Sequence, residues 1–238
     1  MVLAKPLSMV LVSAVVAMPL GGCGGDDEPA ATQTVTVVQT TAATPSPVPT
    51  AKADRALARE ALLQLEDMPV GWTASADDSN AVDCRAFEQA RVPPRAQTPS
   101  FEHGEERAAQ AIVIYDTSDS ADAAVDAFLS PATSACVERE VATTAQERDV
   151  DGAEFGEVTV ARLNVEPLGQ RSGALRVTIP ISASGIDLDV YGDYVFSQVG
   201  RGLSMLFLGS SYSEPDDALR ATLMRRAVDR LADTLEDD

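Results

Sequence analysis

The residues that could make this chain an enzyme are few, and they centre on its one histidine, His103, in the segment FEHGEE. A Ser-His-Asp or Cys-His catalytic device would have to use this imidazole. His103 and Glu106 together could hold a metal or carry a proton, but their position among glutamates favours a solvated loop. The sequence contains no GxSxG nucleophile elbow and no phosphate-binding GxxxxGKS or GxxxxGKT loop. We therefore predict a protein that is not an enzyme, without catalytic residues, bound metal or cofactor.

Two acidic segments carry part of a calcium-binding pattern. Asp149–Gly152 (DVDG) begins like an EF-hand loop, but its glycine comes too early. Asp187–Asp193 (DLDVYGD) has its glycine in the right place, yet the twelfth position is Gln198, where a bidentate glutamate is needed. Leu188 and Val190 alternate with acidic residues, which is typical of a strand. The pattern therefore predicts a strand and no calcium site.

Cys23 follows an apolar run at the start of the chain. Lys5 precedes Pro6–Leu20, which is almost entirely apolar but shorter than the ~20 residues that span a membrane. The tetrad LGGC that ends at Cys23 resembles the bacterial lipobox, whose cysteine is diacylated before the chain is cut in front of it. Two acyl chains anchor a protein stably. We predict a lipoprotein signal peptide over 1–22 and lipidation of Cys23; the alternative is an ordinary secreted protein with an incidental cysteine.

The other two cysteines, Cys84 and Cys136, belong to a chain that we expect to be exported to an oxidising place. One disulfide between them is the simplest interpretation. It would close a loop of about 53 residues and stabilise the fold by ~4 kcal/mol in the chain-entropy model. The alternative is two unrelated buried thiols. A zinc site is not expected, because two cysteines and one histidine lack the spacing of zinc ligands.

The charge and the composition of the first part of the chain describe its surroundings. There are 37 acidic and 18 basic residues, which argues against binding to nucleic acid or to anionic lipid surfaces. Residues 23–52 are rich in Thr, Ala and Pro and cannot bury enough apolar surface to fold. We predict that they form a flexible tether that holds a domain at the outer face of the cytoplasmic membrane, or the cell surface.

Residues 53–238 have the size of one domain. One helix is predicted from Asp54 to about Leu65, because the apolar residues of this segment fall on one face. A second helix is predicted after Ser118 or Ser120, and the chain restarts as another helix at Pro131. Trp72, which follows the stop of the first helix, is interpreted as a core residue rather than the lining of a pocket. The clearest helix follows the capping-box-like Ser213–Asp216, with apolar residues on one side and arginines, Arg220 among them, on the other.

Strand signals dominate the second half of the domain. They cover residues 109–116 and 155–163 and then a meander of alternating runs joined by the turns SASG and VGRG. The alternation places Leu175 and Arg176 on opposite faces, Pro180 suggests an edge strand, and Gly192 suggests a bulge. The order predicts an α+β fold: a mainly antiparallel sheet of about five strands, covered by α-helices, with a long C-terminal helix.

The segment LLQLEDMPVGWT carries a family resemblance. Its pattern Leu65-x-Asp67-x-Pro69-x-Gly71-Trp72, with the lipobox, the tether and two distant cysteines, resembles actinobacterial surface lipoproteins and the extracellular sensor domains of mycobacterial PknH-type kinases. The resemblance implies a non-catalytic extracytoplasmic domain built on a curved antiparallel sheet. Those sensor domains have two disulfides, whereas this chain can form one.

These expectations lead to two functional hypotheses. The first is a lipid-anchored binding module that captures an unknown small ligand or an envelope protein on the exposed face of the sheet or in a cleft beside it. The alternative is an accessory or scaffold lipoprotein in cell-envelope assembly or lipid traffic. A contiguous exposed apolar patch would favour the alternative.

Overall fold

The computed structural model describes residues 51–75, 95–147 and 153–236. The described residues all belong to one compact unit, Pro47–Asp238. The predicted signal peptide, the predicted lipidation site Cys23, most of the predicted tether, Cys84 and the DVDG segment lie outside the described residues.

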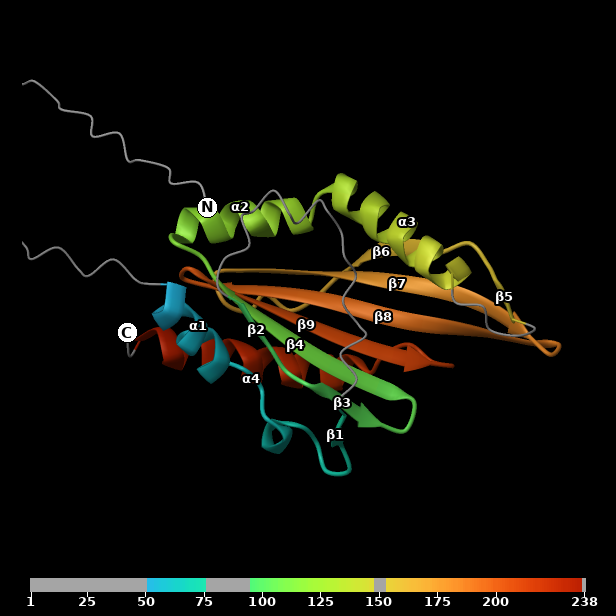
Figure 1. Cartoon of the computed structure of the whole chain (residues 1–238), viewed down its shortest axis with the longest axis horizontal. Helices are drawn as coiled ribbons and strands as arrows, with labels where there is room; N and C mark the ends of the chain where they lie inside the picture. Colours follow the sequence, from blue (N-terminus) through green and yellow to red (C-terminus); the bar gives the residue numbers. More distant parts are fainter. Residues whose placement is uncertain (1–50, 76–94, 148–152, 237–238) are drawn as a thin grey trace, which may run out of the picture. The chain divides into compact units, whose positions relative to one another are not determined.

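In the described residues, the domain is built on one antiparallel sheet of nine strands (Figure 1). The strands are β1 Thr73–Ser75, β2 Arg95–Gln97, β3 Ser100–His103, β4 Glu106–Ile114, β5 Ala153–Phe155, β6 Thr159–Leu163, β7 Arg171–Ala183, β8 Ile186–Val199 and β9 Gly202–Ser211. Their order is β1-β3-β4-β9-β8-β7-β5, with β2 also paired to β4 and β6 also paired to β7. The predicted α+β class is confirmed, but the predicted number of strands was too small. Strands of three residues, such as β1 and β2, are too short to show alternation.

Helices cover the two faces of this sheet in two layers (Figure 1). The helices are α1 Ala51–Glu60, the short 3₁₀ turn η1 Leu65–Asp67, α2 Ser118–Phe128, α3 Pro131–Glu147 and α4 Asp217–Glu236. The buried side chains of α4 and α1 pack with one face, which we call the α4 face. Those of α2 and α3 pack with the opposite face, which we call the α2/α3 face. Because side chains alternate along a strand, each strand supplies residues to both layers.

Local signals explain where the helices begin. The Asp216 carboxylate accepts a hydrogen bond from the Leu219 N–H at 2.7 Å and caps α4, so Pro215 lies just ahead of the helix rather than in its first turn. The Thr117 hydroxyl caps α2 in the same way. The restart at Pro131 is confirmed, because α3 begins there. No helix in the described part of the chain is long and apolar enough to cross a membrane.

Asp54 and Pro180 do not have the roles that the sequence suggested. Asp54 lies inside α1 rather than at its cap; it is buried and paired with the Arg201 guanidinium at 2.6 Å. Strand β7 is not at the edge, because β8 flanks one side and β5 and β6 the other. Pro180 lies opposite the break between β5 and β6, where its carbonyl accepts the Gly156 N–H at 2.8 Å. A missing N–H is tolerated there because the neighbouring strand is itself interrupted.

The strand interpretation of Asp187–Asp193 is confirmed. This segment lies within β8 and pairs in continuous register with β7. Gly192 does not form a bulge, because it stands directly opposite Val177 of β7 and Gly209 of β9. No group of residues able to hold a metal ion occurs in the parts of the chain that the structure describes.

Candidate functional site

His103 and Glu106 come together at the hairpin between β3 and β4. The imidazole Nδ1 lies 3.4 Å from the Glu106 carboxylate, and the ring stacks with Trp72 at a centroid distance of 5.9 Å. The His103 side chain is 53% exposed, as a solvated hairpin residue would be. Trp72 is only 7% exposed and packs with Leu63 and Met68, which confirms it as a core residue. The described contacts of His103 join it to no serine or aspartate, and the absence of catalysis stays a prediction.

Cys136 lies on the buried side of α3, against β7, together with Val137 and Val177. Its sulfur is not a free thiol. Cys84 and Cys23 both lie outside the described residues, so the pairing of Cys136 with Cys84 stays a prediction.

The α2/α3 face carries an apolar area that its helices leave partly open. We call it the open strip: Ala109 and Ala111 of β4, Tyr194 of β8, and Met205 and Phe207 of β9. These five side chains are half-buried, and they sit next to one another because Ala109 is in register with Phe207, and Phe207 with Tyr194. The alternate residues of the same strands point to the α4 face and are closed off from solvent. Ala108, Leu206 and Leu208, for example, are 1–3% exposed.

The positions of α2 and α3 explain why the strip is open. Helix α2 packs on the end of the sheet where β9 begins, against Leu203 and Phe196, and α3 packs farther across, against Val177 and Val158. Figure 1 shows the two helices running along the β6 and β7 side of the sheet while β4 and β9 continue beyond them. Among the described residues, the sheet is wider than the helix layer that covers this face.

Glycines shape the floor of the strip. A Cβ on Gly192 would lie 3.1 Å from the Phe207 ring, and one on Gly209 would lie 3.0 Å from it. The two glycines therefore let the Phe207 ring lie against the sheet, where it meets the Tyr194 ring at 5.1 Å. Burial raises the pKa of the Tyr194 phenol. The ion pair between Arg107 and Glu102, at 3.8 Å, belongs to the same face and makes a polar rim.

A second arrangement, on the α4 face, joins buried charges. We call it the arginine cluster: Arg176 of β7, Asp193 of β8 and Arg220 of α4. The Asp193 side chain is fully buried and accepts hydrogen bonds from Arg176 Nε at 2.7 Å and Nη2 at 2.9 Å, and from Arg220 Nη1 at 2.8 Å. The hydrogen bond to Asp193 is the largest effect that raises the pKa of Arg176. Two guanidiniums thus share one carboxylate under the start of α4.

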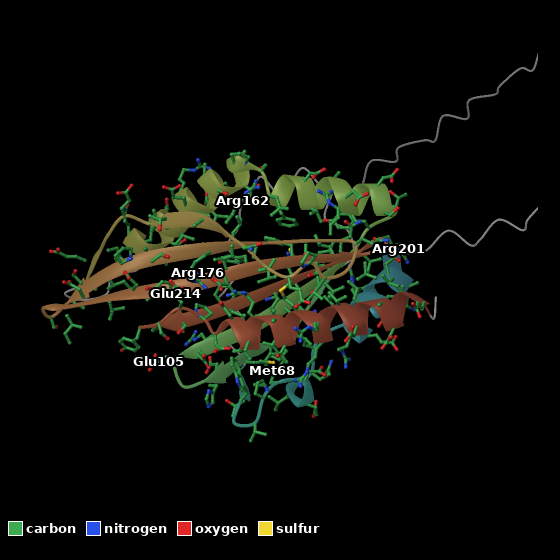
Figure 2. All side chains as sticks on the ribbon, turned by 180° about the vertical axis from the view of Figure 1, so that it is seen from behind. Met68, Glu105, Arg162, Arg176, Arg201 and Glu214 are labelled. Carbon is green, nitrogen blue, oxygen red and sulfur yellow. The ribbon has the colours of Figure 1, made fainter. Side chains whose placement is uncertain are left out.

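Exposed acidic side chains complete the arginine cluster. The carboxylate of Glu214 accepts a hydrogen bond from Arg176 Nη1, and Asp217 accepts one from Arg220 Nη2 at 2.6 Å. The Tyr191 ring lies 5.9 Å from the Arg176 guanidinium carbon. Figure 2 shows Arg176 and Glu214 close together where the sheet meets the start of α4.

No pattern in the sequence directly indicated the arginine cluster. Alternation correctly separated Arg176 from Leu175. The helical pattern placed Arg220 on the side opposite the apolar stripe, and this was wrong: Arg220 lies on the buried side of α4, one turn before Leu223 and Met224. Arg176 and Arg220 are only 8% and 7% exposed. The available signal was a pair of opposite charges at facing positions of one hairpin, since Arg176 and Asp193 are directly in register.

Comparisons with known proteins give remote structural similarity only. No protein-family model and no curated protein matches the chain. The crystal structure of the extracellular domain of PknH from Mycobacterium tuberculosis is 12% identical, covers 72% of this chain and 79% of its own, and has a TM-score of 0.34. The structure of LpqN, described as involved in cell envelope biogenesis of the same organism, is 14% identical, covers 68% and 76%, and has a TM-score of 0.27. The PknH domain that the sequence resembles is thus a structural neighbour, and membership of a family does not follow from it.

Proposed function

We propose that this chain is a lipid-anchored extracytoplasmic domain that binds a protein partner of the cell envelope through the open strip and catalyses no reaction. The observation that carries the proposal is the unequal burial of alternate residues on β4 and β9. Leu206 and Leu208 are closed off, whereas Met205 and Phe207, their immediate neighbours on β9, remain half-buried. An apolar area with a polar rim is the arrangement expected at the centre of a protein interface.

The shape of the strip favours a protein over a small apolar ligand. A ligand lying on an open sheet face is covered from one side only, so it gains only part of the ~0.8 kcal/mol per methylene that full burial supplies. A protein partner can cover the strip and its rim at once. Phe207 and Met205 are suited to such contact, because aromatic and methionine side chains are enriched at interfaces. The net charge of −19 favours a partner that is neutral or basic.

Photocrosslinking in intact cells tests the binding surface. A benzoylphenylalanine at Met205 of the full chain is expected to crosslink one protein reproducibly, and the same group at the exposed hairpin residue Ile186 is expected not to. The second variant Phe207→Glu should abolish the crosslink, whereas Tyr212→Glu, at a 67% exposed residue outside the strip, should leave it intact. A crosslink that is equal at both positions, absent, or made to lipid instead of protein would contradict the proposal.

The membrane anchor is tested separately. The mature protein is expected to begin at Cys23, to carry fatty acid, and to sediment with membranes. Cys23→Ser should abolish incorporation of labelled palmitate and release the chain from the membrane fraction, because one apolar leader without acyl chains anchors poorly. A Cys23→Ser chain that stays membrane-bound would contradict the anchor, while the crosslinking result would still decide the binding surface.

A further inference from the structure

We propose that Arg176 and Arg220 form a binding site for an oxyanion, a phosphate or carboxylate group carried by a ligand. The site lies on the α4 face, so it is separate from the open strip and does not depend on the proposed partner. It is built from two guanidiniums that converge on one oxygen, Asp193 Oδ2, at 2.9 and 2.8 Å.

Asp193 orients the arginines without neutralising both of them. Its carboxylate accepts two hydrogen bonds from Arg176, from Nε and Nη2, and one from Arg220 Nη1. One buried carboxylate faces two guanidiniums, so the three side chains retain one positive charge. Of the remaining nitrogens, Arg176 Nη1 and Arg220 Nη2 bond to the exposed carboxylates of Glu214 and Asp217 instead. Planar guanidinium groups held in this way are suited to bind carboxylate and phosphate oxygens.

The present partners of these outer nitrogens are replaceable. Glu214 is 64% exposed and Asp217 is 84% exposed, whereas the side chains of Arg176 and Arg220 are 10% and 8% exposed. Ion pairs with such exposed carboxylates contribute little to stability, because water and salt screen them. A ligand oxyanion can therefore replace Glu214 and Asp217 with little loss of free energy. The buried hydrogen bonds between Asp193 and both arginines stay in place.

The surroundings keep Arg176 in position for such a ligand. The Tyr191 ring lies beside its guanidinium, and the Tyr191 hydroxyl donates to the Asp189 carboxylate at 3.2 Å. An aromatic face next to a guanidinium limits its rotation and adds cation–π attraction. Two carboxylates that compete for the outer nitrogens predict weak binding in the wild type and tighter binding when either one is removed.

The experiment measures phosphate binding by the full chain in detergent, from the rise in unfolding temperature at constant ionic strength, with chloride as the balancing salt. Glu214→Gln removes a competing carboxylate and leaves the buried contacts intact. It is expected to tighten phosphate binding about 3- to 10-fold, since the displaced interaction is worth about 1 kcal/mol. The matched control is Glu166→Gln, because Glu166 is 57% exposed, close to the 64% of Glu214, and pairs with Arg225 at 3.1 Å. The control is expected to bind phosphate as the wild type does.

A second variant tests the arginines directly. Arg220→Gln leaves Asp193 paired with Arg176, and it should abolish phosphate binding while circular dichroism shows that the fold is kept. If this variant does not fold, the comparison of Glu214→Gln with Glu166→Gln still decides. The proposal is overturned if no protein responds to phosphate more than to chloride, or if the two glutamine variants respond equally.

A further arm separates a free anion from a lipid headgroup. Dihexanoyl phosphatidylglycerol, below the concentration at which it forms micelles, replaces phosphate in the same measurement. A response that Glu214→Gln strengthens for the lipid more than for phosphate assigns the site to a headgroup, and an equal response assigns it to oxyanions in general. A lipid response that Arg220→Gln leaves unchanged counts against the site.

Discussion

On β9, Leu206 lies under α4 and is 3% exposed, whereas Met205 and Phe207 on either side of it face the other layer and are half-buried. The two faces are made by the same strands, yet α4 closes one of them and α2 with α3 leave part of the other open. On the α4 face, the ion pair between Arg176 and Asp193 includes a carboxylate that is fully buried. On the α2/α3 face, the ion pair that joins the sheet to α2, between Arg171 and Asp126, is open to solvent. The comparison shows that helix placement, rather than strand sequence alone, decides which residues are sealed.

Ion pairs on the two faces give the largest expected contrast. Asp193→Asn removes the buried carboxylate that two buried guanidiniums share and leaves them only the exposed carboxylates of Glu214 and Asp217, so we expect the free energy of unfolding to fall by about 3–5 kcal/mol. Asp126→Asn removes the exposed partner of Arg171, whose hydrogen bond lowers the pKa of Asp126, and should leave the midpoint of unfolding almost unchanged.

Urea unfolding followed by circular dichroism measures both variants. Urea is preferred to guanidinium chloride because it does not screen ion pairs. Equal losses in the two variants would mean that the arginine cluster is no better shielded than the pair on α2, and the contrast between the faces would fail.

The regular elements could be predicted from the sequence because their signals are local. The meander of β7, β8 and β9, the helix restart at Pro131 and the amphipathic α4 all follow from alternation, turns and caps within a few residues. The segment from Leu203 to Gly209 is apolar on both faces, as is typical of a central strand, and β9 does lie between β4 and β8.

The predictions that failed concern residues whose spatial neighbours lie far away in the sequence. Pro180 can occupy the inner strand β7 only because the chain that pairs with it is interrupted at Gly156, between β5 and β6. Gly156 lies 24 residues before Pro180. Arg176 is buried because a helix that begins at Asp217 covers it and supplies Arg220. No pattern around Met205 predicts that it stays half-buried while Leu203 is sealed, since α2 makes that difference.

Alkaline pH is expected to weaken the α2/α3 layer next. Burial raises the pKa of Tyr115, which packs in the α2 cluster, to about 12, compared with about 10 in an unfolded chain. The folded state therefore keeps its phenol proton to higher pH than the unfolded state. The stability that this provides is complete below pH 10 and falls as pH rises from about 10 to 12, by about 2–3 kcal/mol.

Tyr115→Phe should make the alkaline loss of stability shallower, as measured by unfolding temperature between pH 8 and 12. Tyr212→Phe is the control, because that side chain is 67% exposed and does not belong to the α2 cluster. A control variant that flattens the curve as much as Tyr115→Phe would contradict the assignment to the α2 cluster.

Alanine substitutions at two glycines of β9 give the smallest expected effects and the most direct comparison. The added Cβ points toward α4 at one glycine and toward the open strip at the other. A Cβ on Gly202 would lie 2.9 Å from Leu231 and 3.0 Å from Leu235 of α4, and Leu231 is fully buried. With no space to move into, α4 or the strand must shift, and we expect Gly202→Ala to lower the free energy of unfolding by about 1–3 kcal/mol.

Gly209→Ala meets the Phe207 ring at 3.0 Å, a contact as short as those at Gly202. Phe207 belongs to the open strip, so its ring can turn toward solvent, and the loss of about 0.5–1 kcal/mol of glycine entropy in the unfolded chain acts in the opposite direction. We expect a change in unfolding free energy of less than about 1 kcal/mol, of either sign, by urea unfolding. If Gly209→Ala instead destabilises as much as Gly202→Ala, the Phe207 ring is held from both sides. The strip would then be a closed part of the core, and the surface proposed to receive a partner would not exist.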